Sequence, residues 1–138
     1  MSDNRNEFFH SINQFTRHFS KALNEALVPL GLYSAQWTII YLLNTNGPSS
    51  QKELAQYLGV EAPTMTRTLS RLESAGWITK EMGADRREKR IILTEAAVQQ
   101  FDGWLQAVRT CENNILKKIS EEELLFTQSI IRKMSEGL

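Results

Sequence analysis

The sequence has little cysteine, no excess of charge and no long apolar run. Cys111 is the only cysteine among 138 residues, which excludes an intramolecular disulfide and a cysteine-built zinc site. With two histidines and no close cluster of ligands, neither a structural metal nor a cofactor is expected. The longest apolar runs, residues 37–43 and 91–93, fall far short of the ~20 residues that span a bilayer, so no membrane partner is expected. The first residues are polar and lack the apolar core of a secretory signal, which favours a cytoplasmic protein.

The charge of the chain is balanced but unevenly placed. The chain has 16 Lys and Arg residues and 16 Asp and Glu residues, so its formal net charge is zero and does not indicate a particular binding partner. Residues 50–93 hold 8 basic and 6 acidic side chains, whereas residues 94–138 hold 5 and 7. Arg67 and Arg71 lie close together in the sequence, and further basic residues crowd into the segment 86–90. This clustering indicates where an anion would bind.

The first part of the chain predicts two helices. Apolar residues recur in steps of 4 and 3 over about residues 5–28, and the following segment, 29–31, contains a proline and a glycine that end a helix. A second helix is expected from Ser34, a good N-cap residue, to the turn at 44–48. Its high apolar content predicts a place in the core.

The next segment predicts a helix-turn-helix. Ser50 and Glu53 form a capping box that begins a short helix over 51–57, and Gly59 marks the turn before a helix over about 62–75. Met65, Leu69 and Leu72 form the inward stripe of that helix, opposite small polar and basic residues: Thr64, Thr66, Arg67, Ser70 and Arg71. A helix that enters the ~12 Å major groove of DNA needs such a face. An ordinary solvated helix face is the alternative.

A β-hairpin with a charged tip is predicted over residues 77–93. Its tip carries Asp85, Arg86 and Arg87, and guanidinium groups there suit the negative potential of a minor groove. Asp85 can hold Arg87 in one geometry. The alternative is a solvated turn with weak local ion pairs. A basic helix followed by a basic hairpin favours DNA binding over either feature alone.

Long helices flank this unit on both sides, and the first of them is the helix over about residues 5–28. Thr94 is expected to cap the second, whose apolar residues again recur in steps of 4 and 3, and a capping box at Ser120 begins a last helix. At ~36 Å the long helices exceed what a unit of about 60 residues can cover, so their apolar seams are expected to pair with a second copy. The expected dimer residues are Phe8, Ile12, Phe15, Val108, Ile115, Ile119, Ile131 and Met134.

Two parts of the sequence form a recognisable pattern: the run from Gln51 to Ile78 and, more specifically, Asp85-Arg86-Arg87 followed by Ile91-Ile-Leu-Thr94. With this pattern the sequence resembles the MarR family of bacterial transcriptional regulators. The resemblance implies one domain over 1–138, mainly α with a small β-hairpin wing (α+β). Within it, a winged helix-turn-helix over 34–94 would bind DNA, and interdigitating helices over 1–33 and 95–138 would form a homodimer.

The resemblance also implies roles for individual residues. Pro63, Thr64, Thr66, Arg67, Ser70 and Arg71 would lie on the recognition helix, and Arg86 and Arg87 would be the wing arginines. Ser49, Ser50 and Gln51 would approach phosphate through hydroxyls and backbone N–H groups, which agrees with the anion affinity of helix N-termini. Glu61 departs from the small polar residue often found there; its carboxylate would repel phosphate or accept a hydrogen bond from cytosine.

A small aromatic or phenolic anion is a further partner that the resemblance implies. His18, Tyr33, Trp37 and Tyr41 are the expected lining residues, although aromatic residues at helical spacing more often belong to a core. Cys111 lies on an apolar seam, where a thiol is usually inert, so packing is favoured over a redox role.

The residues together predict a regulator of transcription, most simply a repressor, that binds a pseudo-palindromic site on double-stranded DNA as a homodimer. No catalytic constellation is present, so an enzyme is the least favoured class. The alternative is a winged-helix adaptor that docks an acidic protein and does not bind DNA.

Overall fold

The computed structural model describes residues 2–83 and 88–138. Along these residues the elements are, in order, α1 (Ser2–Leu27), a short 3₁₀ helix η1 (Val28–Leu30), α2 (Ser34–Asn46), β1 (Ser49–Ser50), α3 (Gln51–Leu58), α4 (Ala62–Ser74), β2 (Ile78–Met82), β3 (Lys89–Leu93), α5 (Glu95–Ile115) and α6 (Glu121–Glu136). The predicted mainly α fold with a small hairpin is confirmed.

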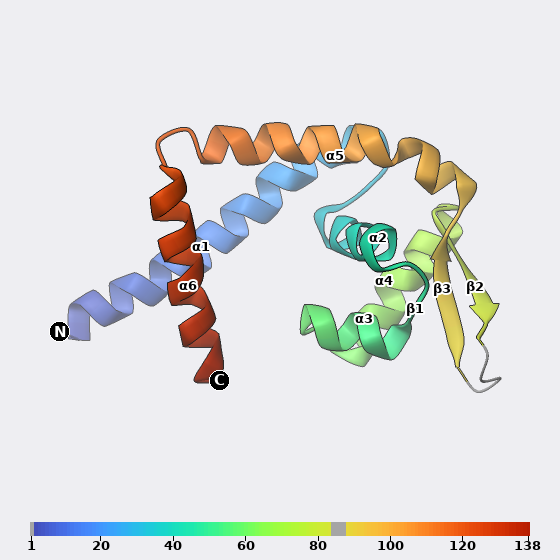
Figure 1. Ribbon diagram of the computed structural model, residues 1–138, viewed down its shortest axis with the longest axis horizontal. Coiled ribbons are helices and arrows are strands. Elements are labelled where there is room, and N and C mark those ends of the chain that lie inside the picture. Colours follow the sequence, from blue (N-terminus) through green and yellow to red (C-terminus); the bar gives the residue numbers. More distant parts are fainter. Residues whose placement is uncertain (1, 84–87) are drawn as a thin grey trace.

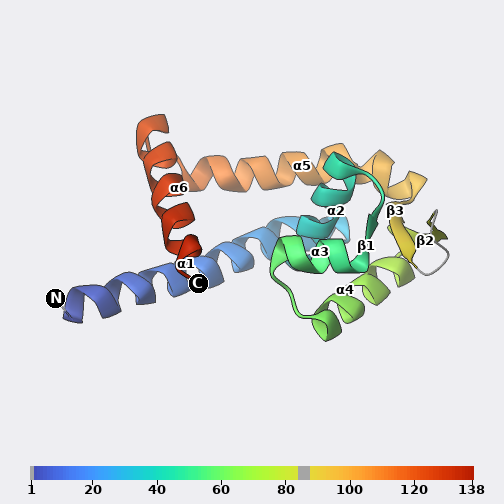
Figure 2. The ribbon, with the colours of Figure 1, turned by 60° about the horizontal axis from the view of Figure 1, so that its bottom comes forward.

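The long helices and the compact unit occupy different parts of the molecule (Figure 1). Helix α5 runs along one edge, and the helices α2 to α4 and the sheet lie together beneath one half of it. The first half of α1 and all of α6 extend away from this unit, at the other end of the molecule. Figure 2 shows the start of α4 at the outer edge, on the side away from α5.

The sheet has one strand more than the sequence predicted. Strands β2 and β3 form the expected antiparallel hairpin, with Ile78 opposite Leu93 and Met82 opposite Lys89. The two-residue strand β1 adds to the other side of β3, with Ser50 opposite Arg90, so the sheet order among the described residues is β1-β3-β2. A strand of two residues shows no alternation of apolar and polar residues in the sequence, so it is recognised only by its pairing with β3.

Side-chain caps begin three helices, α3, α5 and α6, where the sequence predicted them. The Glu53 N–H donates to Ser50 Oγ at 3.1 Å, the Ala97 N–H to Thr94 Oγ1 at 3.2 Å, and the Glu123 N–H to Ser120 Oγ at 3.0 Å. The predicted cap at Ser34 is wrong.

Helix α2 has Tyr33 as its N-cap residue, and Ser34 is already helical. The Ser34 N–H donates to Asn24 Oδ1 of α1 at 2.8 Å. The Asn24 side chain therefore accepts a hydrogen bond from a backbone N–H at the start of α2, which is the role expected of the Ser34 hydroxyl. The helix also continues to Asn46, further than predicted, before Gly47 ends it at φ 78°.

One apolar core joins the compact unit to the adjoining halves of the long helices. Leu23 and Leu27 of α1 and Phe101 and Trp104 of α5 belong to the same buried cluster as Leu69 of α4. Four of the apolar seam positions of α5, Ala97, Phe101, Trp104 and Val108, therefore pack within the chain. Val108 was predicted to contact a second copy, but it is only 3% exposed and has little surface left for a partner.

The remaining halves of the long helices keep their apolar side chains exposed. Phe8, Ile12 and Phe15 on α1 are 43%, 37% and 54% exposed. On α6, Phe126 and Ile131 are 68% and 53% exposed, and none of its residues is buried. Helix α1 thus uses its second half for the core and leaves its first half exposed, whereas α6 has no buried residue.

Two tryptophans fix the link between α1 and α2 against α5 and the sheet. The Trp104 Nε1–H donates to Leu30 O at 3.0 Å, and the Trp77 Nε1–H donates to Gly31 O at 3.3 Å. The two rings meet edge to face with their centroids 4.9 Å apart. Gly31 has φ 83°, a conformation that a residue with a side chain rarely adopts. This junction holds the compact unit in a defined orientation to α5.

Candidate nucleic-acid interface

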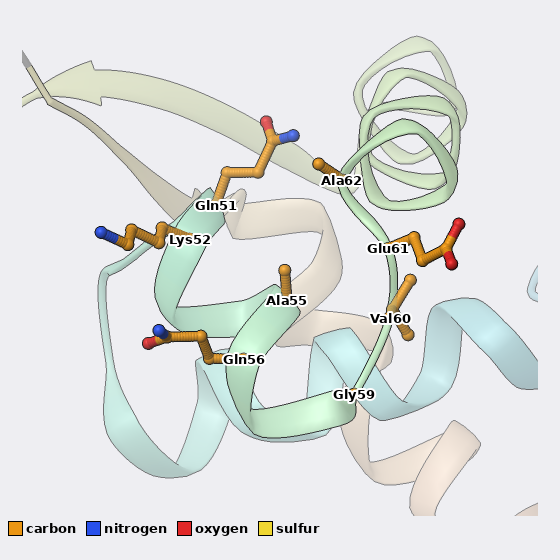
Figure 3. A pocket seen from close by; sticks show the side chains of 8 residues that line it. All are labelled: Gln51, Lys52, Ala55, Gln56, Gly59, Val60, Glu61 and Ala62. Atoms are coloured by element: carbon orange, nitrogen blue, oxygen red, sulfur yellow. The ribbon is translucent and has the colours of Figure 1, made fainter.

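Helices α3 and α4 form the predicted helix-turn-helix. Gly59 ends α3 in the left-handed conformation at φ 64°, and its N–H donates to the carbonyls of Ala55 and Gln56. The turn leaves an open hollow of about 590 Å³ between the two helices (Figure 3). Its lining residues are Gln51, Lys52, Ala55, Gln56, Gly59, Val60, Glu61 and Ala62.

Helix α4 has the two faces that the sequence predicted. Met65, Leu69 and Leu72 are at most 1% exposed and hold the helix against the core. The opposite face is exposed and carries Pro63, Thr64, Thr66, Arg67, Ser70 and Arg71. Because this helix begins at the outer edge of the molecule (Figure 2), its hydroxyl and guanidinium groups are accessible to a large partner.

Hydrogen bonds organise the first turns of this face. The Arg67 guanidinium donates to Thr64 Oγ1 at 3.3 Å, which holds the arginine along the helix. Thr66 Oγ1 donates to Ala62 O at 2.9 Å and accepts from Gln51 Nε2 at 2.7 Å. The Thr66 hydroxyl therefore ties α4 to the start of α3, and its capacity for a further partner is reduced.

The expected phosphate contacts of the Ser49 and Ser50 hydroxyls do not fit the structure. The two residues are 5% and 1% exposed, because β1 places them against β3. Ser49 Oγ donates to Gly47 O at 3.0 Å, and Ser50 Oγ accepts from the Glu53 N–H. Both hydroxyls therefore make hydrogen bonds within the folded chain, whereas Gln51, at the first position of α3, remains partly accessible.

Arg90 is a residue whose contacts the sequence did not indicate. Its Nη1 donates to Pro48 O at 3.1 Å and lies 3.8 Å from Glu53 Oε1. Glu53 Oε1 also accepts from the Ser50 N–H at 3.5 Å. Arg90 thereby connects the hairpin to the capping box of α3. The pairing of Ser50 with Arg90 would have revealed this connection, but it depends on the unpredicted strand β1.

The predicted wing residues Asp85, Arg86 and Arg87 lie outside the described residues. The described parts of the hairpin end at Gly83 and resume at Glu88, and the Gly83 N–H donates to Glu88 O at 3.2 Å. The base of the predicted wing is therefore closed, and the roles of its three charged residues stay predictions.

The four residues predicted to line an effector site lie in different surroundings. Trp37 is 6% exposed and stacks on Phe101 with centroids 5.5 Å apart, so it is a core residue. Tyr33 and Tyr41 are 58% and 39% exposed, and His18 is exposed on α1. Trp37 and Tyr41 contact each other with centroids 5.7 Å apart, which is the one aromatic pair among the four in the described structure.

A second hollow lies between α1 and α5. Its volume is about 300 Å³, and its lining residues are Phe15, Phe19, Arg109, Glu112, Ile115 and Leu116. The Arg109 guanidinium donates to Glu112 Oε1 at 2.8 Å. This bond and the Glu112 charge raise the pKa of Arg109 above its ordinary value, with a smaller contribution from the Tyr41 hydroxyl. The hollow combines aromatic rings with a cation, a feature that the sequence did not locate.

The described residues contain no group of three or more His, Cys, Asp or Glu side chains that could hold a metal ion. Within the same residues, no single helix is long and apolar enough to cross a membrane. Residues Asp3–Leu30 and Ser34–Asn46 meet the length and composition criteria only as a pair, bent by 75°.

Comparison with known proteins gives consistent matches. The sequence model of the MarR family matches residues 32–89. The uncharacterized HTH-type transcriptional regulator YwoH of Bacillus subtilis (strain 168) is 45% identical over 125 residues, which cover 91% of this chain and 85% of YwoH.

Two solved structures are similar over nearly their whole length. A MarR transcriptional regulator from Methanosarcina mazei Go1 has a TM-score of 0.83 at 19% identity, covering 96% of each chain. A mutant E. coli MarR complexed with operator DNA has a TM-score of 0.82 at 24% identity, covering 94% of this chain and 91% of that one. These likenesses establish the shared fold.

The fold and the exposed face of α4 define a winged helix-turn-helix protein flanked by long helices. The extent and identity of the match to YwoH, together with the matching family model, show that this chain belongs to the MarR family of transcriptional regulators.

Proposed function

We propose that the chain regulates transcription by binding double-stranded DNA through α4. The observation that supports this most directly is the accessible stripe of Thr64, Arg67 and Arg71 on a helix held rigidly by its buried face. Similar E. coli MarR has been crystallised with operator DNA, which agrees with this use of the fold. The exposed groups match the donors and acceptors of major-groove base edges and phosphates.

The proposed complex contains two copies on a pseudo-palindromic site. Two α4 helices would enter successive major grooves ~34 Å apart. Gln51, at the start of α3, would place backbone N–H groups near phosphate, and Arg86 and Arg87, oriented by Asp85, would contact the flanking minor grooves. Residues 34–94 form the reading unit of this proposal, and residues 1–33 and 95–138 form the dimerisation helices.

The second copy is proposed from apolar side chains that the described chain leaves exposed. They lie on the first half of α1, at the end of α5 and just after it, and on α6, away from α4 (Figure 1). Exposed apolar side chains concentrated in one part of a molecule favour a protein interface there. The proposed dimer residues are Phe8, Ile12, Phe15, Ile115, Ile119, Ile131 and the half-buried Met134.

The protein acts in this proposal as a repressor that a small aromatic or phenolic anion releases. The hollow between α1 and α5 offers the rings of Phe15 and Phe19 beside Arg109, whose guanidinium an anion would share with Glu112. A ligand that binds one spacing of the two reading units better than another would shift the equilibrium toward that spacing. A repressor needs no partner other than DNA, so repression is the simplest use of the exposed face of α4.

Selection of bound duplexes from a random pool tests the proposal. We expect enrichment of a pseudo-palindrome whose half-site centres are about one helical turn apart, with binding that weakens as salt is raised. A winged-helix adaptor would instead bind no duplex in a salt-dependent way and would be monomeric at micromolar concentration. That result would contradict DNA binding.

A further inference from the structure

Glu61 occupies the N-cap position of α4, at the end of the helix that projects outward (Figure 2). Its backbone is extended, with φ −68° and ψ 148°, and its side chain makes no capping hydrogen bond. The carboxylate is exposed, and among residues 2–83 and 88–138 it forms no ion pair. Glutamate is not a favoured N-cap residue, so its contribution to helix stability is limited to the attraction between its charge and the helix dipole.

The backbone on both sides of Glu61 is held in place. The Val60 N–H donates to Ala55 O at 3.0 Å, and the Met65 N–H donates to Glu61 O at 3.0 Å. Pro63 further restricts the first turn of the helix, because its ring fixes φ. Figure 3 shows the carboxylate extending away from Lys52, across the hollow from it. The backbone that carries the Glu61 carboxylate therefore has a fixed position next to the exposed face of α4 that is proposed to bind DNA.

This end of α4 is poorly suited to phosphate. A carboxylate repels a phosphate group, and Pro63 removes one of the backbone N–H groups that a helix N-terminus offers to anions. A partner of the carboxylate must instead donate a hydrogen bond. In the major groove, cytosine presents its N4 amino donor without an acceptor, whereas adenine places N7 beside its amino group, and guanine and thymine present acceptors.

We propose that Glu61 is a specificity-determining residue, and that its carboxylate selects cytosine at one position of each half-site by accepting a hydrogen bond from N4. This inference rests on the proposed DNA binding through α4. It assigns a role in base selection to the residue that joins the helix-turn-helix turn to the recognition helix. The rival explanation is general repulsion, in which the carboxylate lowers affinity for every duplex equally.

The test compares duplex selection by the wild-type chain, Glu61→Gln and Glu73→Gln. Glu73 is a matched control because it is an exposed glutamate near the other end of α4. We expect cytosine at one position of each half-site with the wild-type chain and with Glu73→Gln. With Glu61→Gln we expect adenine at that position, because a carboxamide can both donate to N7 and accept from N6.

Competition titrations then measure the size of the effect. On the wild-type site, Glu61→Gln should lose roughly 5- to 150-fold in affinity relative to the site with adenine substituted, the range for one good base contact. Unchanged base preference with a uniform gain in affinity would show general repulsion and overturn the inference alone. Failure of the wild-type chain to enrich any duplex would overturn both the inference and the proposed function.

Discussion

At the scale of single residues, Arg67 is the side chain from which we expect the largest effect on DNA binding. It lies on the exposed face of α4, and its guanidinium donates to Thr64 Oγ1 at 3.3 Å. An arginine preoriented in this way can form a bidentate contact to guanine with less loss of side-chain entropy.

We predict that Arg67→Ala weakens binding to the selected site by about 1–3 kcal/mol and relaxes base preference at one position. Titration of a labelled duplex at fixed salt measures the loss, and Glu73→Ala on the same helix is the control. An equal loss on all duplexes would instead assign Arg67 to phosphate.

Cys111 illustrates how packing controls the chemistry of one residue. It is partly buried against the core, and burial is the main cause that raises the pKa of its thiol, with a smaller contribution from the Glu112 charge. The thiolate is the reactive form, so a raised pKa lowers the reactive fraction at a given pH.

We predict that Cys111 is alkylated more slowly at pH 8 in the folded chain than in the chain unfolded in urea, and that the folded rate rises as the pH is increased. Mass spectrometry of the alkylated fraction over time measures both rates. Equal rates in the folded and unfolded chains would contradict the inert role assigned to this thiol.

At the scale of elements, the start of α3 is where the sheet and the helix-turn-helix meet. Ser50 pairs with Arg90 through β1 and caps α3 through Glu53, and it is 1% exposed. Loss of its hydroxyl would leave the Glu53 N–H without its cap in a crowded site.

We predict that Ser50→Ala lowers the free energy of unfolding by about 1 kcal/mol, within a range of about 0.5–2. Urea unfolding at one fixed protein concentration measures it. Ser20→Ala, at an exposed position of α1, is the control and should change stability by no more than about 0.5 kcal/mol. Equal stability of the two variants would show that the cap contributes nothing.

At the scale of the whole molecule, the exposed apolar face of α1 and α6 indicates a dimer. Ile131 is 53% exposed on α6, far from the recognition helix. Burial of a charge in an apolar interface without a partner is strongly unfavourable.

We predict that Ile131→Asp shifts the chain toward monomer and weakens binding to a two-half-site duplex much more than to a single half-site. Sedimentation equilibrium and duplex titration measure the two effects. Tyr57→Ser, which removes a 74% exposed side chain from α3, should leave the oligomeric state unchanged. A wild-type chain that is already monomeric at micromolar concentration would contradict the proposed dimer.

Features that depend on neighbouring residues and features that depend on distant segments differ in how well the sequence predicts them. The inward stripe of α4 and the caps at Ser50, Thr94 and Ser120 were predicted correctly, because each depends on residues within one or two turns of helix. The strand β1 and the ion pair of Arg90 with Glu53 depend on segments about 40 residues apart, which no periodicity reveals.

The sequence by itself determined the helices, the hairpin and the reading face of α4, since hydrophobic period and capping chemistry are local properties. Only the tertiary structure decided which parts of the long helices pack in the core and which stay exposed. Val108 was predicted to contact a second copy and Trp37 to line a ligand site, because residues of these types occur at such places. In the folded chain α5 packs over α1 and α2 and buries both residues in the core. Burial depends on which surfaces meet, and that is a property of the folded chain as a whole.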